Sequence, residues 1–173
     1  MTNRTYESSI PVFLHYLNQL AKLVEKAEAY CAEMGTDQTS VLQARLSRDM
    51  HPFRSQVQIA DDFALRTCAA LANIPKPDYG ADEVTLAGLR TRIARTTALL
   101  RGLSAAQFDG ADAKIVTSQA GNANLTLTGL EFVSHYALPN FFFHLSISYA
   151  ILRHVGVNIG KEDFDGFHAY SND

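Results

Sequence analysis

The sequence predicts an all-α protein, a four-helix bundle with a small β-hairpin in the crossover before the last helix. Apolar residues recur at helical spacing in four long segments, which is typical of helices that bury one face. Two short β-prone runs lie between the third and fourth of these segments. The chain has 173 residues, enough for one substantial core, and we therefore expect a single domain over residues 1–173.

The first two helices are predicted by apolar stripes with spacings of three and four residues. The first should end at Met34-Gly35. Ser8 or Ser9 can cap its start, and an earlier start with a kink at Pro11 is also compatible with the pattern. The second helix follows a short helical turn and can be capped by Asp49. Its stripe leaves Asp61, Asp62 and Arg66 elsewhere on the helix surface. The two stripes are Ile10, Leu14, Leu17, Ala21, Val24 and Cys31, and Phe53, Val57, Ala60, Ala64, Cys68 and Leu71.

The third helix follows a connector over residues 73–80 that contains two prolines and a glycine. Gly102 is its expected stop. Four arginines lie mostly off its apolar stripe, and we interpret them as a solvated surface rather than a phosphate-binding one. Residues 114–118 and 124–127 are β-prone runs around a polar turn, which predicts the hairpin. The stripe is Leu86, Leu89, Ile93, Thr97 and Leu100, and the arginines are Arg90, Arg92, Arg95 and Arg101.

The fourth helix is predicted to begin at a capping box formed by Thr128 and Glu131. A kink or restart is expected near Pro139-Asn140, because proline lacks an amide hydrogen and disfavours a helical conformation in the residue before it. Gly156 is a suitable left-handed stop. Beyond it, Phe164, Phe167 and Tyr170 can pin the tail to the bundle or to a second subunit, while the last residues should fray.

Composition excludes several classes of function. A net charge of -3 and a pI near 6.0 give no broad attraction to nucleic acid or to anionic membranes, so neither is an expected partner. No apolar stretch approaches the roughly 18 residues that span a bilayer, and no signal sequence precedes the first helix, so we expect a cytoplasmic protein. Cys31 and Cys68 are isolated, which favours buried, reduced thiols. Hydrolase and nucleotide-binding motifs are absent.

Histidine spacing gives one good candidate for a polar site, His144. On a continuous helix His135 would lie on the opposite face from His144, and His154 would lie about 15 Å further along the axis. No pair of histidines has the spacing that places two metal ligands on one helix face. His51, at the start of the second helix, could join a metal only if ligands from the fourth helix lay nearby. A hydrogen-bonded, buried imidazole remains the alternative for His144.

The run ALPNFFFH over residues 137–144, followed by SYAILRHVGV over 148–157, resembles a bacterial family of unknown function in the DinB/YfiT-like superfamily. Asp49-Met50, Gln56-Val57 and Gly160-Lys161-x-Asp163-Phe164 extend the resemblance over most of the chain. It implies an up-down-down-up bundle with a long crossover and frequent homodimers. In many members it also implies a divalent metal held by three histidines, some of these proteins being thiol-dependent transferases.

This chain departs from the superfamily at the implied metal site. Members commonly open the last helix with His-x-x-x-His, where this chain has Asn140 and His144, and the third histidine aligns near Gln56. Neutral amides are poor ligands for zinc or nickel. The resemblance therefore implies a degenerate metal site.

Three functional hypotheses follow from the sequence. The leading one is a small-molecule-binding protein whose polar pocket comprises Gln56, Asn140, His144 and Ser148. The alternative is a divalent-metal-dependent transferase or hydrolase, with His144 and either His51 or His135 as ligands to zinc or nickel. The third is a structural homodimer without a ligand. The sequence identifies no reaction.

Overall fold

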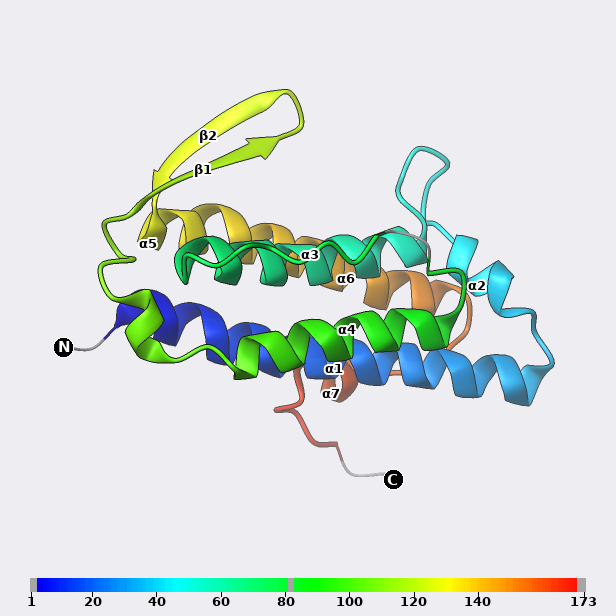
Figure 1. The fold of residues 1–173 in the computed structure, drawn as a ribbon. Helices are drawn as coiled ribbons and strands as arrows, with labels where there is room; N and C mark the ends of the chain where they lie inside the picture. Colours follow the sequence, from blue (N-terminus) through cyan, green and yellow to red (C-terminus); the bar gives the residue numbers. More distant parts are fainter. Residues whose placement is uncertain (1–2, 81–82, 171–173) are drawn as a thin grey trace.

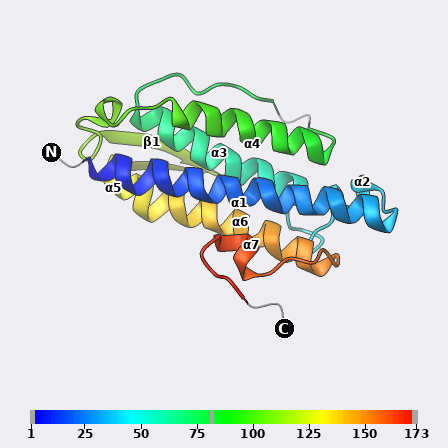
Figure 2. The ribbon, with the colours of Figure 1, turned by 90° about the horizontal axis from the view of Figure 1, so that it is seen from below.

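Four long helices form the molecule, and the computed structural model describes residues 3–80 and 83–170 (Figure 1). The first and last helices run in one direction, and the two middle helices run in the other (Figures 1 and 2). This is the predicted up-down-down-up bundle, so the predicted fold class is confirmed. The four helices are α1 (Arg4–Met34), α3 (Phe53–Leu71), α4 (Leu86–Arg101) and α6 (Leu138–His154).

The parallel direction of α3 and α4 requires a connection that returns along the bundle. The connector over residues 73–80 runs back along the bundle (Figures 1 and 2). The remaining helical elements are short: α2 (Gln38–Gln43), η1 (Ala105–Phe108), α5 (Gly129–Glu131), the π-helical turn η2 (Phe132–Ala137) and α7 (Lys161–Asp165).

The core lies between the four long helices and is rich in phenylalanine. α3 packs mainly on α6, and α1 packs mainly on α4. Phe13 of α1 meets Phe141 of α6 edge to face, with the ring centroids 5.1 Å apart. Burying one such side chain contributes about 1.5–3 kcal/mol. Cys31 and Cys68 are free and buried, as predicted.

The structure decides between the two predicted starts of α1 and corrects the predicted start of α3. α1 begins at Arg4, where the Asn3 side chain accepts a hydrogen bond from the Tyr6 amide. The earlier of the two predicted starts is therefore correct, and the Ser8 and Ser9 hydroxyls instead donate to carbonyls one turn back. α3 begins after Pro52 rather than at a cap formed by Asp49. The carboxylate of Asp49 accepts a hydrogen bond from Ser47.

The predicted hairpin is present as β1 (Ile115–Ala120) and β2 (Ala123–Thr128), paired antiparallel from Ile115↔Thr128 to Ala120↔Ala123. Only Val116 of its side chains is fully buried. At the foot of the hairpin, a Cβ on Gly129 would lie 2.0 Å from the carbonyl oxygen of Ala111. Glycine is therefore required where the chain turns into α5.

The last helix begins at the predicted capping box, in which Thr128 and Glu131 bond each other's backbone amides. The irregularity expected at Pro139-Asn140 occurs one turn earlier, as the π-helical turn Phe132–Ala137. Pro139 then lies in the first turn of α6, where a missing amide hydrogen is tolerated. Gly156, at φ +98°, follows the helix end as predicted.

The C-terminal segment packs on the bundle. The Phe164 ring contacts Tyr16 and Tyr149, and Phe167 stacks on His15 with the centroids 4.4 Å apart. Lys26 of α1 forms an ion pair with Asp163 of α7, with 2.7 Å between nitrogen and oxygen. The predicted pinning to the bundle is therefore observed. The predicted fraying falls on residues 171–173, outside the described residues.

The interpretation of the charged residues on α3 and α4 as surface groups was wrong for two of them. Asp61 is fully buried and Arg92 nearly so. The Arg92 Nε donates to Asp61 Oδ2 at 3.1 Å, and its Nη1 donates to Glu83 Oε1 at 3.0 Å. Helical spacing orients a side chain within its own helix but does not reveal a partner on the next one.

Within the described ranges, no helix has both the length and the apolar character that crossing a membrane requires.

Candidate functional site

The polar site is centred on His144, in the second turn of α6 on the side that packs on α3. The packing of Phe141, Leu145 and Leu152 against the core fixes this face of the helix. The imidazole is partly buried and lies nearly parallel to the Phe63 ring of α3, with the centroids 5.9 Å apart.

Gln56 fixes the orientation and the tautomer of His144. The Gln56 Nε2 donates to the carbonyl oxygen of His51 at 3.1 Å, and a carbonyl can only accept. The Gln56 Oε1 is therefore the atom that lies 2.7 Å from His144 Nδ1. Since an amide oxygen also only accepts, Nδ1 carries the proton. The Nε2 of the neutral ring then carries a lone pair, and no hydrogen-bond partner for it lies among the described residues.

The surroundings keep His144 neutral. Burial lowers the pKa of this imidazole to about 4, and the positive charges of His51 and Arg66 act in the same direction. Each makes the imidazolium less favourable than in water. At neutral pH the ring is therefore a hydrogen-bond acceptor at Nε2.

The other two predicted pocket residues make backbone contacts instead. The Asn140 Nδ2 donates to the carbonyl oxygen of Tyr136 at 2.8 Å. The Ser148 hydroxyl is fully buried and donates to the carbonyl oxygen of His144 at 2.9 Å. The structure thus brings together Gln56 and His144, whereas Asn140 and Ser148 stabilise the α6 backbone.

Of the two weaker histidine candidates, His51 lies near His144 and His135 does not. His51 is exposed at the entry to α3 and close enough to influence the charge of His144. His135 is exposed in the π-helical turn, and its electrostatic partner is Glu131. His51 therefore borders the site, and His135 has no observed link to it.

Sequence reasoning missed three residues of the cluster: Phe63, Arg66 and Tyr136. The Arg66 guanidinium lies 3.8 Å from the Phe63 ring centroid, and its Nη2 donates to the Tyr136 hydroxyl at 3.3 Å. The only signal in the sequence was the spacing of Phe63 and Arg66, which places an aromatic ring and an arginine on one helix face.

A hollow of about 410 Å³ adjoins this cluster. It extends along α3 from His51 to Arg66 and reaches Arg92 of α4 and Gly80 of the connector. Among the described residues, Ser55, Gln58, Ile59 and Asp62 also line it. Arg66 belongs both to the cluster around His144 and to the lining of the hollow, so the two adjoin at Arg66. The volume of the hollow lies within the range of small-molecule pockets.

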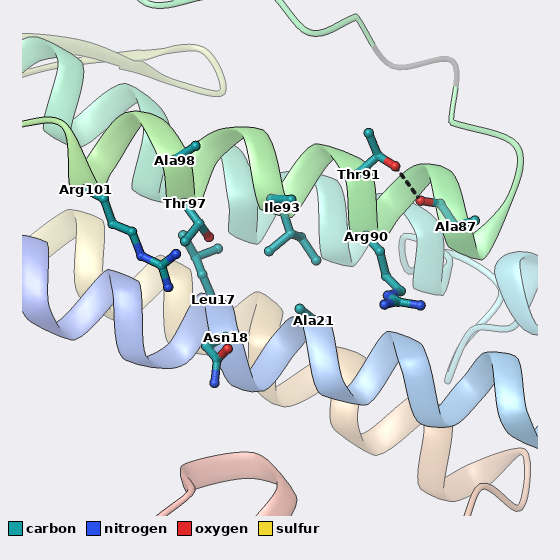
Figure 3. Close-up of a pocket in the computed structure, with 11 residues that line it drawn as sticks. Leu17, Asn18, Ala21, Ala87, Arg90, Thr91, Ile93, Thr97, Ala98 and Arg101 are labelled. Atoms are coloured by element: carbon teal, nitrogen blue, oxygen red, sulfur yellow. Dashed lines mark hydrogen bonds between the residues drawn. The ribbon is translucent and has the colours of Figure 1, made fainter.

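A larger hollow of about 510 Å³ lies between α1 and α4. Figure 3 shows Leu17 and Ile93 between the two helices and Arg90 and Arg101 on either side of them. The rest of the lining is mostly alanine and threonine. Among the described residues this lining includes no histidine, cysteine or carboxylate, and Arg90 is paired with Glu28 at 2.7 Å. It therefore has no group suited to acid-base chemistry or metal binding.

The residues at the implied metal position do not fit a three-histidine centre. The Gln56 oxygen is bonded to His144, the Asn140 amide is bonded to the backbone, and only His144 offers an imidazole lone pair. Among residues 3–80 and 83–170, no group of three or more histidine, cysteine, aspartate or glutamate side chains converges as metal ligands. A catalytic zinc usually needs three such protein ligands.

The four-helix bundle and the hairpin crossover define a DinB-like helical protein. Comparison with known proteins agrees. A family model described as "Domain of unknown function (DUF1993)" matches residues 5–165, and the chain belongs to this family.

A solved structure gives the same relationship. The crystal structure of a DinB family member protein from Shewanella denitrificans is 36% identical to this chain, covers 97% of it and 95% of its own length, and superposes with a TM-score of 0.87. The resemblance inferred from the ALPNFFFH run is thus confirmed. No curated protein matches this chain.

Proposed function

We propose that this protein binds a small polar organic molecule at the His144 site without a metal ion. One observation carries the proposal: Gln56 holds His144 as a neutral imidazole with its proton on Nδ1 and a free lone pair on Nε2. A ligand hydroxyl, amide or similar donor can hydrogen-bond to that nitrogen. The adjoining hollow supplies room for the rest of the molecule.

The donor set supports a binder over a metal-dependent enzyme. In metal sites, a ligating histidine usually donates its second ring nitrogen to an oxygen acceptor, and Gln56 occupies that supporting role here. Two further imidazole or thiolate ligands would still be required, and the described residues do not supply them. The site therefore favours recognition by hydrogen bonds.

The test is a ligand screen by NMR on untagged protein kept in a chelator. The library contains small alcohols, amides, amines and carboxylates, and the reporters are the His144 ring signals. We expect at least one compound class to shift these signals saturably in wild type and not in His144→Gln. Binding that appears only after zinc or nickel is added, or a library with no effect on His144, would contradict the proposal.

A further inference from the structure

We propose that the hollow beside His144 takes the carboxylate of a small organic monoanion, and that Arg66 is the group that binds it. This inference rests on the proposed function, because it names the ligand class of the same site.

The Arg66 guanidinium is held in place with donors to spare. Phe63 supports one face at 3.8 Å, and Tyr136 accepts one hydrogen bond from Nη2. The Nε is buried and has no hydrogen-bond partner among the residues that the structure describes. A guanidinium has five N–H donors in a planar fork that matches a carboxylate. A fork immobilised in this way loses little freedom when it binds.

The nearest acid, Asp62, forms a long ion pair with Arg66 and is shared with Lys76. Asp62 Oδ2 lies 3.8 Å from Arg66 Nε, beyond hydrogen-bonding distance, while Asp62 Oδ1 forms an ion pair with Lys76. These three groups carry one excess positive charge, and His51 stands at the same hollow.

The other arginine of the hollow is already satisfied. Arg92 is paired with Asp61 and with Glu83, and it also donates to the carbonyl oxygen of Gly80 at 2.8 Å. Arg66 is therefore the cation available to a ligand. Because Asp62 also lines the hollow, a dianion such as phosphate would be repelled more than a monoanion. A carboxylate meets this condition.

The size of the hollow and its lining residues determine which compounds are suitable for testing the inference. About 410 Å³ accommodates a single-ring compound, and Ile59 supplies an apolar surface. Benzoate presents a carboxylate on such a ring, and benzamide has nearly the same shape without the charge. Comparing the affinities of benzoate and benzamide isolates the contribution of the carboxylate charge to binding.

The experiment titrates the full chain with benzoate, benzamide and inorganic phosphate, with a chelator present. We expect benzoate to shift the Arg66 Nε–H and Ile59 methyl signals saturably, at least about tenfold more tightly than benzamide or phosphate. Arg66→Lys should weaken benzoate binding about tenfold, because lysine keeps the positive charge but lacks the two parallel N–H donors that a guanidinium offers to a carboxylate. Arg66→Gln should abolish binding, and Arg101→Gln, on the far side of α4, should change nothing. Amide dispersion in the NMR spectrum verifies that each variant is folded.

The wild-type signals keep the inference testable even if an Arg66 variant unfolds. Benzoate that leaves the Arg66 Nε–H unmoved, or that binds no better than benzamide or phosphate, overturns it. If neutral compounds shift His144 while benzoate leaves the Arg66 Nε–H unmoved, the carboxylate inference fails and the proposed function stands. If no compound shifts either residue, both fail.

Discussion

Gln56 is the residue on which the chemistry of the site depends, because it makes two hydrogen bonds that only one amide orientation allows. One bond goes to the His51 carbonyl and the other to the His144 ring. A nearly fully buried amide cannot exchange these partners for water without cost. It therefore acts as a positioning residue for His144.

Replacing this amide by a carboxylate tests the positioning role. Gln56→Glu places a negative charge beside the Nδ1 proton, so the pKa of His144 should rise well above its value of about 4. A pH titration of the His144 ring signals by NMR measures the change. Gln43→Glu, at an exposed position on α2, is the matched control and should leave the titration unmoved. An unchanged midpoint in Gln56→Glu would show that the two side chains are not bonded in solution.

The lowered pKa of His144 also predicts how stability depends on pH. The unfolded ring titrates near 6.5 and the folded ring near 4, so the unfolded chain binds the extra proton between these values. Stability from this group is complete above pH 6.5 and is lost as the pH falls toward 4. Between pH 7 and pH 5 the wild type should lose about 1 kcal/mol more than His144→Gln, a figure reduced for the partial exposure of the ring. Urea unfolding at both pH values measures the difference, and equal losses would contradict it.

At the scale of elements, the buried pair of Asp61 and Arg92 joins α3 to α4. Thr96 adds a hydrogen bond to the same Asp61 oxygen at 2.9 Å, while Asp61 Oδ1 has no partner within residues 3–80 and 83–170. Helices that run parallel and are linked by a long connector gain register from such a contact. The pair is costly to desolvate, and its effect on stability depends on both partners being present.

Removing one partner should therefore cost more than replacing both. Asp61→Ala should destabilise the protein by about 3–5 kcal/mol, because the buried Arg92 loses one of the two carboxylates with which it is paired. The double variant Asp61→Leu with Arg92→Met should recover most of that loss. Urea unfolding of the three proteins makes the comparison, and a loss below about 1 kcal/mol in Asp61→Ala would mean that water compensates Arg92.

The foot of the hairpin gives a second prediction at this scale. Gly129→Ala introduces a Cβ that would lie 2.0 Å from the Ala111 oxygen and 2.9 Å from Leu71 Cδ2. Overpacking of this kind costs about 1–3 kcal/mol. Gly102→Ala, at an ordinary φ of -78°, should cost less than about 0.5 kcal/mol. Thermal unfolding of both variants tests the prediction, and equal melting temperatures would refute the close approach.

At the scale of the whole molecule, the sequence predicted the four helices, the hairpin and most of the boundaries. Periodicity and local capping determine these features, as the Thr128–Glu131 box and the Gly102 stop illustrate. The early start of α1 and the π-helical turn before Pro139 were harder to predict, because alternative caps and breaks lie within one turn of each other.

The site was only partly predictable for a physical reason. His144 stood out as an imidazole in an apolar helix, and the family resemblance pointed to Gln56. Arg66, Tyr136 and the buried Arg92 depend on how α3 meets its neighbours, and a single helix pattern carries no information about that contact. Homodimerisation, implied by the resemblance, stays a prediction for sedimentation analysis.

Metal content tests the central claim, recognition at His144 without a metal, most directly. Elemental analysis of untagged protein, purified without chelator, is compared with folded His144→Ala. The account predicts no stoichiometric zinc or nickel that depends on His144. About one equivalent of metal in the wild type that disappears in the variant would contradict it and make His144 a ligand of a metal-dependent enzyme.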